Sequence, residues 1–279
     1  MSHRTQRTTG IAALLLAAAA LLTAAPASAQ QLYRSVGPDG TVTYSDRPPS
    51  APESGAAPAK KPVSGADQDV FQFGARSVRV PKPQGFVPIV AIAPKVAQIA
   101  QAYAPTNRLV EMYFTADDAK GLAAGKGITP ASSFDLQVMR QFDGVAVSEK
   151  QFEEMIKQSA AQMERAGQDM KKSLDTETKQ GNANAKRSIG VDPKAAVSGT
   201  EYLGVYRREP WGLFFTMKNH IATRGDTGRT MIASTATVLV NQQVLFLNSS
   251  AVFHDESDQK QIEQAMSAWV DAIRKANLK

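Results

Sequence analysis

Residues 200–253 constrain the fold of this chain more than any other stretch, because they hold four strand-forming runs with little between them. The runs are rich in β-branched and aromatic residues, which favour strands. The last two runs are separated by Asn241 and Gln242 alone, and asparagine tolerates the left-handed backbone of a two-residue hairpin loop. The sequence therefore predicts antiparallel strands at 202–207, 212–220, 230–240 and 244–252, and shorter runs predict strands at 77–80, 108–115 and 134–142.

Amphipathic helices are predicted on both sides of this run. Residues 255–276 place apolar residues at helical spacing, and their acidic first turn suits the positive end of a helix dipole. Residues 149–179 carry a narrow apolar stripe, but a continuous helix of that length would span about 45 Å. We therefore expect a break or bend near Gly167, or fraying of the helix beyond it. A shorter helix is expected between Pro94 and Pro105.

Helices that stand before, between and after a block of strands indicate the α+β class rather than an alternating parallel fold. We predict an antiparallel β-sheet packed with helices in a sandwich. The order of elements is similar to that of the PsbP-like sandwich family, whose members end with two long strands and a carboxy-terminal helix. This resemblance concerns the fold and implies no function.

The first 29 residues are typical of a secretory signal rather than of a folded element. Arg4 and Arg7 give a positive start, residues 11–25 form an apolar stretch, and residues 27–29 offer small side chains to a signal peptidase. The stretch is shorter than the roughly 20 apolar residues that a transmembrane helix needs. We expect cleavage before Gln30 and a periplasmic or secreted bacterial protein with no transmembrane span after cleavage.

A small β-hairpin is predicted directly after the signal, because Gly37-Pro38-Asp39-Gly40 is a turn sequence between two β-prone runs. Tyr33, the run Asp39-Gly40-x-Val42-x-Tyr44-Ser45-Asp46 and the pair Pro48-Pro49 resemble an amino-terminal module called domain of unknown function 4124, which is found on secreted bacterial envelope proteins. The resemblance covers about residues 30–49. It implies a bacterial, exported protein and no known activity.

Composition divides the remainder of the chain into a linker and a globular part. Residues 48–70 are dense in Pro, Ala, Ser, Gly and Lys, and such a segment cannot bury enough apolar area to offset its chain entropy. The chain has no cysteine, but a domain of about 200 residues folds without disulfides. We expect a signal peptide at 1–29, a hairpin module at 30–47, a linker at 48–70 and an α+β sandwich domain at 71–279.

The net charge of +6 does not indicate a nucleic-acid partner, because the excess lies near the amino terminus. Residues 30–110 hold nine Lys and Arg against five Asp and Glu, whereas residues 111–279 hold 21 of each sign. A neutral main body lacks the concentrated positive stripe that phosphate binding requires. We expect no nucleic-acid partner, and instead an envelope protein or a cell-wall component of unknown identity.

The sequence has no local motif for catalysis, for a cofactor or for a metal. Neither His220 nor His254 has the spacing of a metal-binding motif, and a Gly-x-Ser-x-Gly elbow is absent. Ser250 ends a predicted strand close to His254, so a hydrolase site would need these two residues and a carboxylate from elsewhere. We predict no catalytic, cofactor-binding or metal residues, and Ser250 and His254 are the candidates of the hydrolase alternative.

Four aromatic residues in or between the first two strands of the run, Tyr202, Tyr206, Trp211 and Phe215, either pack in the core or line a ligand groove. A groove there would favour a small-ligand or lipid carrier. The leading hypothesis is an exported, non-catalytic periplasmic protein that binds or scaffolds an envelope component. The envelope hydrolase and the carrier are the alternatives.

Overall fold

The computed structural model describes residues 33–36, 42–45, 68–124, 130–165, 170–190, 196–222 and 228–278. The predicted signal peptide lies outside these residues, as does the predicted linker up to residue 67. The chain divides into two compact units, a small one at Ala24–Lys61 and a larger one that contains Pro62–Lys279.

The small unit contains the hairpin that the turn sequence predicts. Strands β1 (Tyr33–Val36) and β2 (Val42–Ser45) pair antiparallel, with Tyr33 opposite Ser45 and Val36 opposite Val42. The predicted two-stranded module is therefore confirmed.

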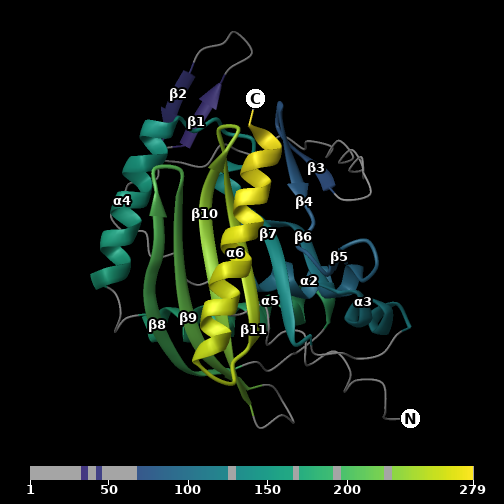
Figure 1. The fold of residues 1–279 in the computed structure, drawn as a ribbon. Helices are drawn as coiled ribbons and strands as arrows, with labels where there is room; N and C mark the ends of the chain where they lie inside the picture. The colour runs from purple at the N-terminus through teal and green to yellow at the C-terminus, as the bar shows by residue number, and fades with distance from the viewer. Residues whose placement is uncertain are drawn as a thin grey trace. The chain divides into compact units, whose positions relative to one another are not determined.

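A seven-stranded antiparallel sheet is the centre of the larger unit, with the strand order β5-β6-β7-β11-β10-β9-β8 (Figure 1). The four strands predicted between residues 200 and 253 are confirmed. Asn241 and Gln242 have φ of 48° and 61°, the left-handed geometry expected of their hairpin loop. The strands are β5 (Phe86–Pro88), β6 (Asn107–Thr115), β7 (Ser132–Met139), β8 (Ala196–Glu209), β9 (Gly212–Ala222), β10 (Arg229–Val240) and β11 (Gln243–Val252).

Five helices are described in the larger unit: α2 (Pro94–Tyr103), α3 (Ala116–Ala123), α4 (Glu149–Arg165), α5 (Met170–Ile189) and α6 (Glu256–Asn277). The stretch predicted as one long helix with a break forms α4 and α5, and Gly167 between them lies outside the described residues. A 3-10 turn (Arg140–Phe142) follows β7, where the predicted strand continued to residue 142. None of the described helices is both long and apolar enough to cross a membrane.

Three elements were not predicted, namely α3, β5 and β3 (Gln68–Phe73). Strand β3 pairs with β4 (Arg76–Pro81) in a separate two-stranded sheet. It begins inside the segment predicted as linker, because Phe71 and Phe73 bury their rings in the core under α6 and bring the preceding residues into the fold.

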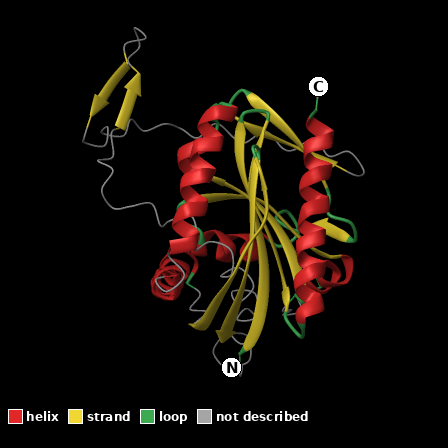
Figure 2. Cartoon of the chain, turned by 60° about the vertical axis from the view of Figure 1, so that its left-hand side comes forward, coloured by secondary structure: helices red, strands yellow, loops and turns green. Residues whose placement is uncertain are grey.

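Helices cover both faces of the seven-stranded sheet (Figure 2). Met266, Trp269 and Ile273 of α6 pack on one face against side chains such as Leu247 of β11. On the opposite face, α4 packs on β9 and β10 through Phe152 and Ile156. The predicted class, α+β with an antiparallel sheet between helices, is therefore confirmed, and the chain ends with two long strands and a helix.

Candidate functional site

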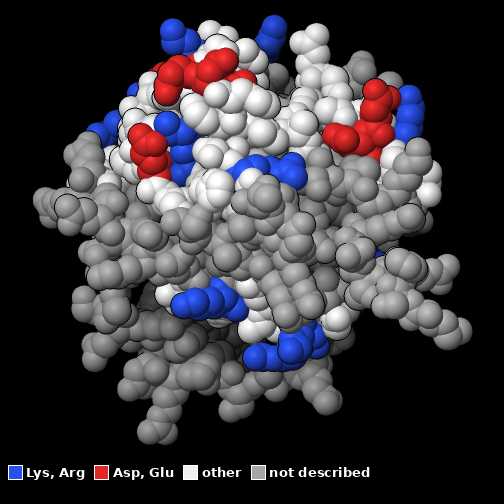
Figure 3. Space-filling view, turned by 90° about the horizontal axis from the view of Figure 1, so that it is seen from below, with Lys and Arg blue, Asp and Glu red and all other residues white. Residues whose placement is uncertain are grey.

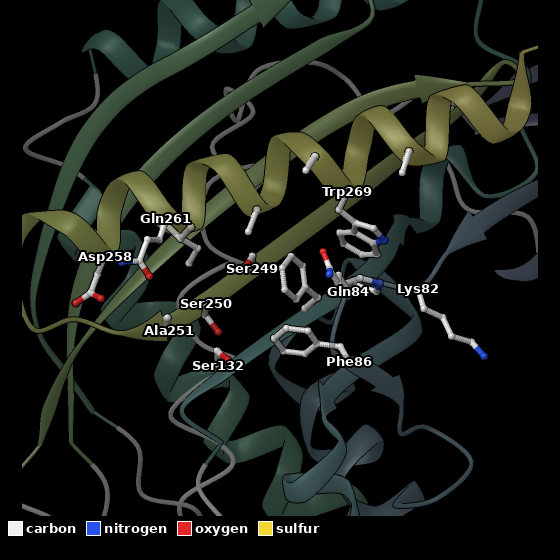
Figure 4. A pocket seen from close by; sticks show the side chains of 16 residues that line it. Lys82, Gln84, Phe86, Ser132, Ser249, Ser250, Ala251, Asp258, Gln261 and Trp269 are labelled. Atoms are coloured by element: carbon white, nitrogen blue, oxygen red, sulfur yellow. The ribbon is translucent and has the colours of Figure 1, made fainter. Parts of the chain in front are cut away.

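A cleft of about 540 Å³ opens between α6 and the segment that joins β4 to β5 (Figure 4). Its lining comes from four separate stretches of the chain: residues 82–86, the start of β7, the end of β11 and one flank of α6. Sites for small molecules typically measure about 300 to 1,000 Å³, so the cleft has the size of such a site.

Aromatic rings form one end of the cleft. The rings of Phe86 and Phe134 meet edge to face at 4.8 Å between centroids, and Phe134 meets Trp269 in the same way at 5.2 Å. The indole Nε1 of Trp269 donates a hydrogen bond of 2.8 Å to the Pro81 carbonyl. This bond holds the Trp269 ring, and with it α6, against the end of β4. Edge-to-face pairs are favoured ring geometries, so this apolar wall is preformed.

The flank of α6 that faces the cleft carries small side chains. Ala265, Ala268 and Ala272 follow Gln261 at intervals of four, three and four residues, which places all four on one side of the helix. Large side chains at these positions would fill the space. The cleft therefore exists because this row is small while the neighbouring row, with Met266 and Trp269, fills the core.

The floor of the cleft contains Ser249 of β11. Side chains alternate along a strand, and Leu247 two residues earlier packs under α6, so Ser249 lies on the α6 face. The residue is 3% exposed, and it stands directly opposite Phe134 of β7. Ser234, which lies opposite Ser249 on β10, shares a hydrogen bond of 2.7 Å with the Tyr206 hydroxyl.

A carboxylate stands at the other end of the cleft, at the start of α6. Asp258 Oδ2 accepts hydrogen bonds from the backbone N–H groups of His254 at 2.6 Å and Asp255 at 3.2 Å. These donors, that of His254 first, hold the pKa of Asp258 below its ordinary value. Figure 4 shows Asp258 and Gln261 at this end of the cleft and Trp269, Gln84 and Lys82 at the other.

The candidates of the hydrolase alternative have separate partners. The Ser250 hydroxyl is buried and lies 3.0 Å from the hydroxyl of Ser133, with which it shares a hydrogen bond. His254 is exposed, and its Nδ1 lies 3.3 Å from Asp258 Oδ2. The structure thus places a carboxylate beside His254, but the Ser250 side chain lies on the sheet face away from α6.

The four aromatic candidates for a groove are not brought together, because they lie on opposite faces of the sheet. Tyr202 and Phe215 belong to the cluster under α4, with ring centroids 6.4 Å apart. Tyr206 and Trp211 pack on the α6 face beside Phe214. The sheet itself separates the two pairs, and the cleft beside α6 uses none of the four.

A buried polar network occupies the sheet face away from α6. Asp135 Oδ1 accepts hydrogen bonds from Asn248 at 2.9 Å and Gln137 at 2.7 Å, and Gln137 accepts one from Asn107 at 2.8 Å. Thr235 donates to Asn248 at 3.0 Å. Burial raises the pKa of Asp135 to about 6. The members satisfy one another, which indicates a structural role in the core.

Among the described residues, no group of three or more His, Asp or Glu side chains is arranged to hold a metal ion. On the face seen in Figure 3, acidic and basic side chains lie close together along one edge.

Comparison with known proteins identifies the amino-terminal segment. Residues 12–69 match the model of a domain of unknown function, DUF4124. The match includes both strands of the hairpin, so the resemblance carried by Tyr33 and the Asp39–Asp46 run is confirmed. The DUF4124 match ends at Asp69, the second residue of β3, and spans a minor part of the chain.

No curated protein matches the chain. Two solved structures are similar to it at 10% sequence identity: the Ran-binding protein Mog1p of Saccharomyces cerevisiae, with a TM-score of 0.29 over 76% of this chain and 92% of its own, and a mutant of Mog1, with a TM-score of 0.31 over 76% and 93%. A likeness at these values says nothing about function.

The sequence did not reveal the cleft. One signal was present, the alanine row on α6, but a row of alanines is equally typical of close helix packing. Ser249 in the cleft gives no sequence signal, since serine is common on strands.

Proposed function

We propose that this protein is an exported binding protein of the bacterial envelope, and that its main domain holds a small, largely apolar molecule in the cleft beside α6. The observation that carries the proposal is the cleft itself, a space of about 540 Å³ with a preformed wall of three aromatic rings and a flank of alanines. Apolar concave sites with a few polar groups are typical of small-ligand binding.

Export is the second part of the proposal. It rests on the basic start, the apolar stretch and the small residues before Gln30, together with the resemblance of the hairpin to a module found on secreted envelope proteins. A ligand taken from the envelope fits the apolar lining, because membrane-derived molecules carry hydrocarbon.

An uncharged apolar dye tests binding in the cleft. N-phenyl-1-naphthylamine, whose emission rises in apolar surroundings, is titrated into the purified protein, and we expect saturable binding of one dye per chain. Ala265→Trp places a large ring in the cleft from an exposed position of α6 and should weaken binding at least tenfold. Gln264→Trp, on the same helix but outside the lining, is the matched control and should leave the affinity unchanged.

Two outcomes contradict the binding proposal. The dye either fails to saturate the protein, or binds equally well to the wild type and to Ala265→Trp. Circular dichroism of both variants establishes that each has kept the native fold.

A hydrolase is the second candidate, because Asp258 supplies a carboxylate beside His254. The Ser250 side chain, however, lies on the sheet face away from α6, where it bonds Ser133. A catalytic serine needs an imidazole base within hydrogen-bond reach. The test is turnover of p-nitrophenyl acetate by the wild type, Ser250→Ala and His254→Ala. The hydrolase proposal requires that both variants lose a measurable wild-type rate, and equal rates in all three proteins would contradict it.

A further inference from the structure

We infer that the molecule held in the cleft is a lipid with one unbranched hydrocarbon chain, such as a fatty acid or a lysophospholipid, and that this chain lies extended along α6. The inference rests on the proposed function and names the class of its ligand. It is carried by the length of the cleft, by the positions of the charged groups in its lining and by the pairing of the strands in its floor.

The cleft is long and follows the axis of α6. The helix contributes lining residues from Asp258 to Ala272, which is about four turns. A helix rises about 1.5 Å per residue, so the part of the cleft from Gln261 to Ala272 is about 16 Å long. The hydrocarbon core of a bilayer is about 30 Å thick, and one leaflet is therefore about 15 Å thick. One extended acyl chain of a membrane lipid thus matches the cleft in length.

The two charged residues in the described lining stand at opposite ends of the cleft. Asp258 lies at the start of α6, and Lys82 lies at the other end, beside Trp269 (Figure 4). Between these ends the helix presents Ala265 and Ala268. A long uncharged body suits this middle part, because no charged group has to lose its water there when the ligand binds.

A polypeptide fits the cleft less well than a lipid chain does. The two strands in the floor, β7 and β11, are each paired on both sides, so the floor offers no open strand edge to the backbone of a peptide. The N–H of Phe86, at the start of β5, already donates to the Pro83 carbonyl at 3.1 Å. Peptide N–H and C=O groups buried without partners are unfavourable, whereas a hydrocarbon chain has no such groups.

A series of primary alcohols tests whether the cleft recognises a chain by its length. 1-Octanol, 1-decanol and 1-dodecanol share one small head group and differ only in the chain. We expect the affinity, measured by calorimetry, to rise about tenfold for each pair of added methylenes, because each methylene is buried along α6. Cyclododecanol has the carbon atoms of dodecanol in a ring, and it should bind at least tenfold more weakly than dodecanol.

Gln261→Trp then tests where the chain lies. The new ring, on an exposed position of α6, closes the end of the cleft near Asp258. The part from Ala265 to Ala272 stays open over about 10 Å, roughly two thirds of the original length, which holds octanol but not all of dodecanol. Dodecanol should therefore bind at least tenfold more weakly, and octanol should change less than twofold. Gln264→Trp, exposed on the same helix but outside the lining, is the matched control and should change neither affinity.

Laurate and lauroyl lysophosphatidylcholine distinguish the two sources of such a chain. Both carry the chain length of dodecanol, and the head groups are those of a fatty acid and of a lysophospholipid. We expect at least one of them to bind as tightly as dodecanol and to lose affinity in Gln261→Trp. If both bind more weakly than octanol, the ligand is not a single-chain lipid.

The outcomes separate this inference from the function on which it rests. If the dye binds but the affinity for the alcohols does not depend on chain length, the chain inference is wrong while binding in the cleft stands. The same conclusion follows if cyclododecanol binds as tightly as dodecanol, or if Gln261→Trp weakens octanol and dodecanol equally. If neither the dye nor any alcohol gives saturable binding, the proposed function fails as well.

Discussion

Asp135 and Ser249 are buried polar residues on neighbouring strands, and their side chains lie in different surroundings. Asp135 faces a network in which amides and a hydroxyl satisfy one another. Ser249 faces the cleft. Buried polar groups are almost always paired in folded proteins. The Asp135 network is therefore assigned to stability.

Asp135 makes stability depend on pH in a direction opposite to that of most carboxylates. Burial raises its pKa from 3.8 to about 6, so between these values the folded chain binds more protons than the unfolded chain. Its contribution to stability is therefore greatest below about pH 4 and is lost as the pH rises to about 6. Since one pH unit corresponds to about 1.4 kcal/mol, the loss is about 3 kcal/mol.

Asp135→Asn should remove this loss, because the amide oxygen can still accept from Asn248 and Gln137 while no charge is buried. Urea unfolding at several pH values checks the prediction: we expect equal stability at about pH 4 and a variant more stable than the wild type by up to about 3 kcal/mol at about pH 7. Asp117→Asn, whose side chain is 95% exposed, is the control and should show no such divergence. A variant that is less stable than the wild type at neutral pH would contradict the prediction.

At the scale of the element, the helices and strands that were predicted are those that a short stretch of sequence specifies by its periodicity, its capping residue or its turn. Helix α6 has its periodic apolar face, and its capping residue Asp255 begins the predicted stretch. The β10–β11 hairpin has its two-residue loop. Strand β5 has only three residues, and α3 directly follows a strand without a break, so neither gives a periodic pattern long enough to recognise. Strand β3 is held by packing of its aromatic residues, which composition alone does not reveal.

The packing of α5 on α2 depends on a glycine. A Cβ on Gly181 would lie 2.1 Å from Cδ1 of Tyr103, and the Tyr103 hydroxyl hydrogen-bonds Asn182 at 2.6 Å. Gly181→Ala gains up to about 1 kcal/mol of helix propensity, but overpacking of this kind costs about 1 to 3 kcal/mol. We expect net destabilisation, measured as a lower midpoint of urea unfolding.

The double variant Tyr103→Ala with Gly181→Ala distinguishes the clash from other causes. With the ring removed, the added methyl group should no longer be unfavourable, and Gly181→Ala should be neutral or stabilising in that background. An equal cost of Gly181→Ala with and without the Tyr103 ring would show that the close approach of α2 and α5 is not its origin.

At the scale of the whole molecule, the cleft is a product of topology. Strand β11 pairs with β7, more than 100 residues earlier in the sequence, and this pairing brings residues 132–134 beside residues 249–251. The segment at 82–86 reaches the same place through β4, which the Trp269 indole holds against α6. Sequence patterns identified the elements, but they could not identify which ends meet, because no local signal encodes a contact over that separation.

The proposed export makes a prediction for the whole chain. A signal peptidase reads small residues at the two outer positions of the Ala27-Ser28-Ala29 tripeptide, whereas the middle position is permissive. Expressed in a bacterium, the wild type should be recovered from the periplasmic fraction with the intact mass of residues 30–279. Ala29→Arg should accumulate as the uncleaved precursor, because a long charged side chain does not fit the peptidase pocket.

Ser28→Arg is the matched control and should still be cleaved before Gln30. Met1 retained on wild-type protein from the cytosolic fraction would contradict export, and the ligand of the cleft would then have to come from the cytosol.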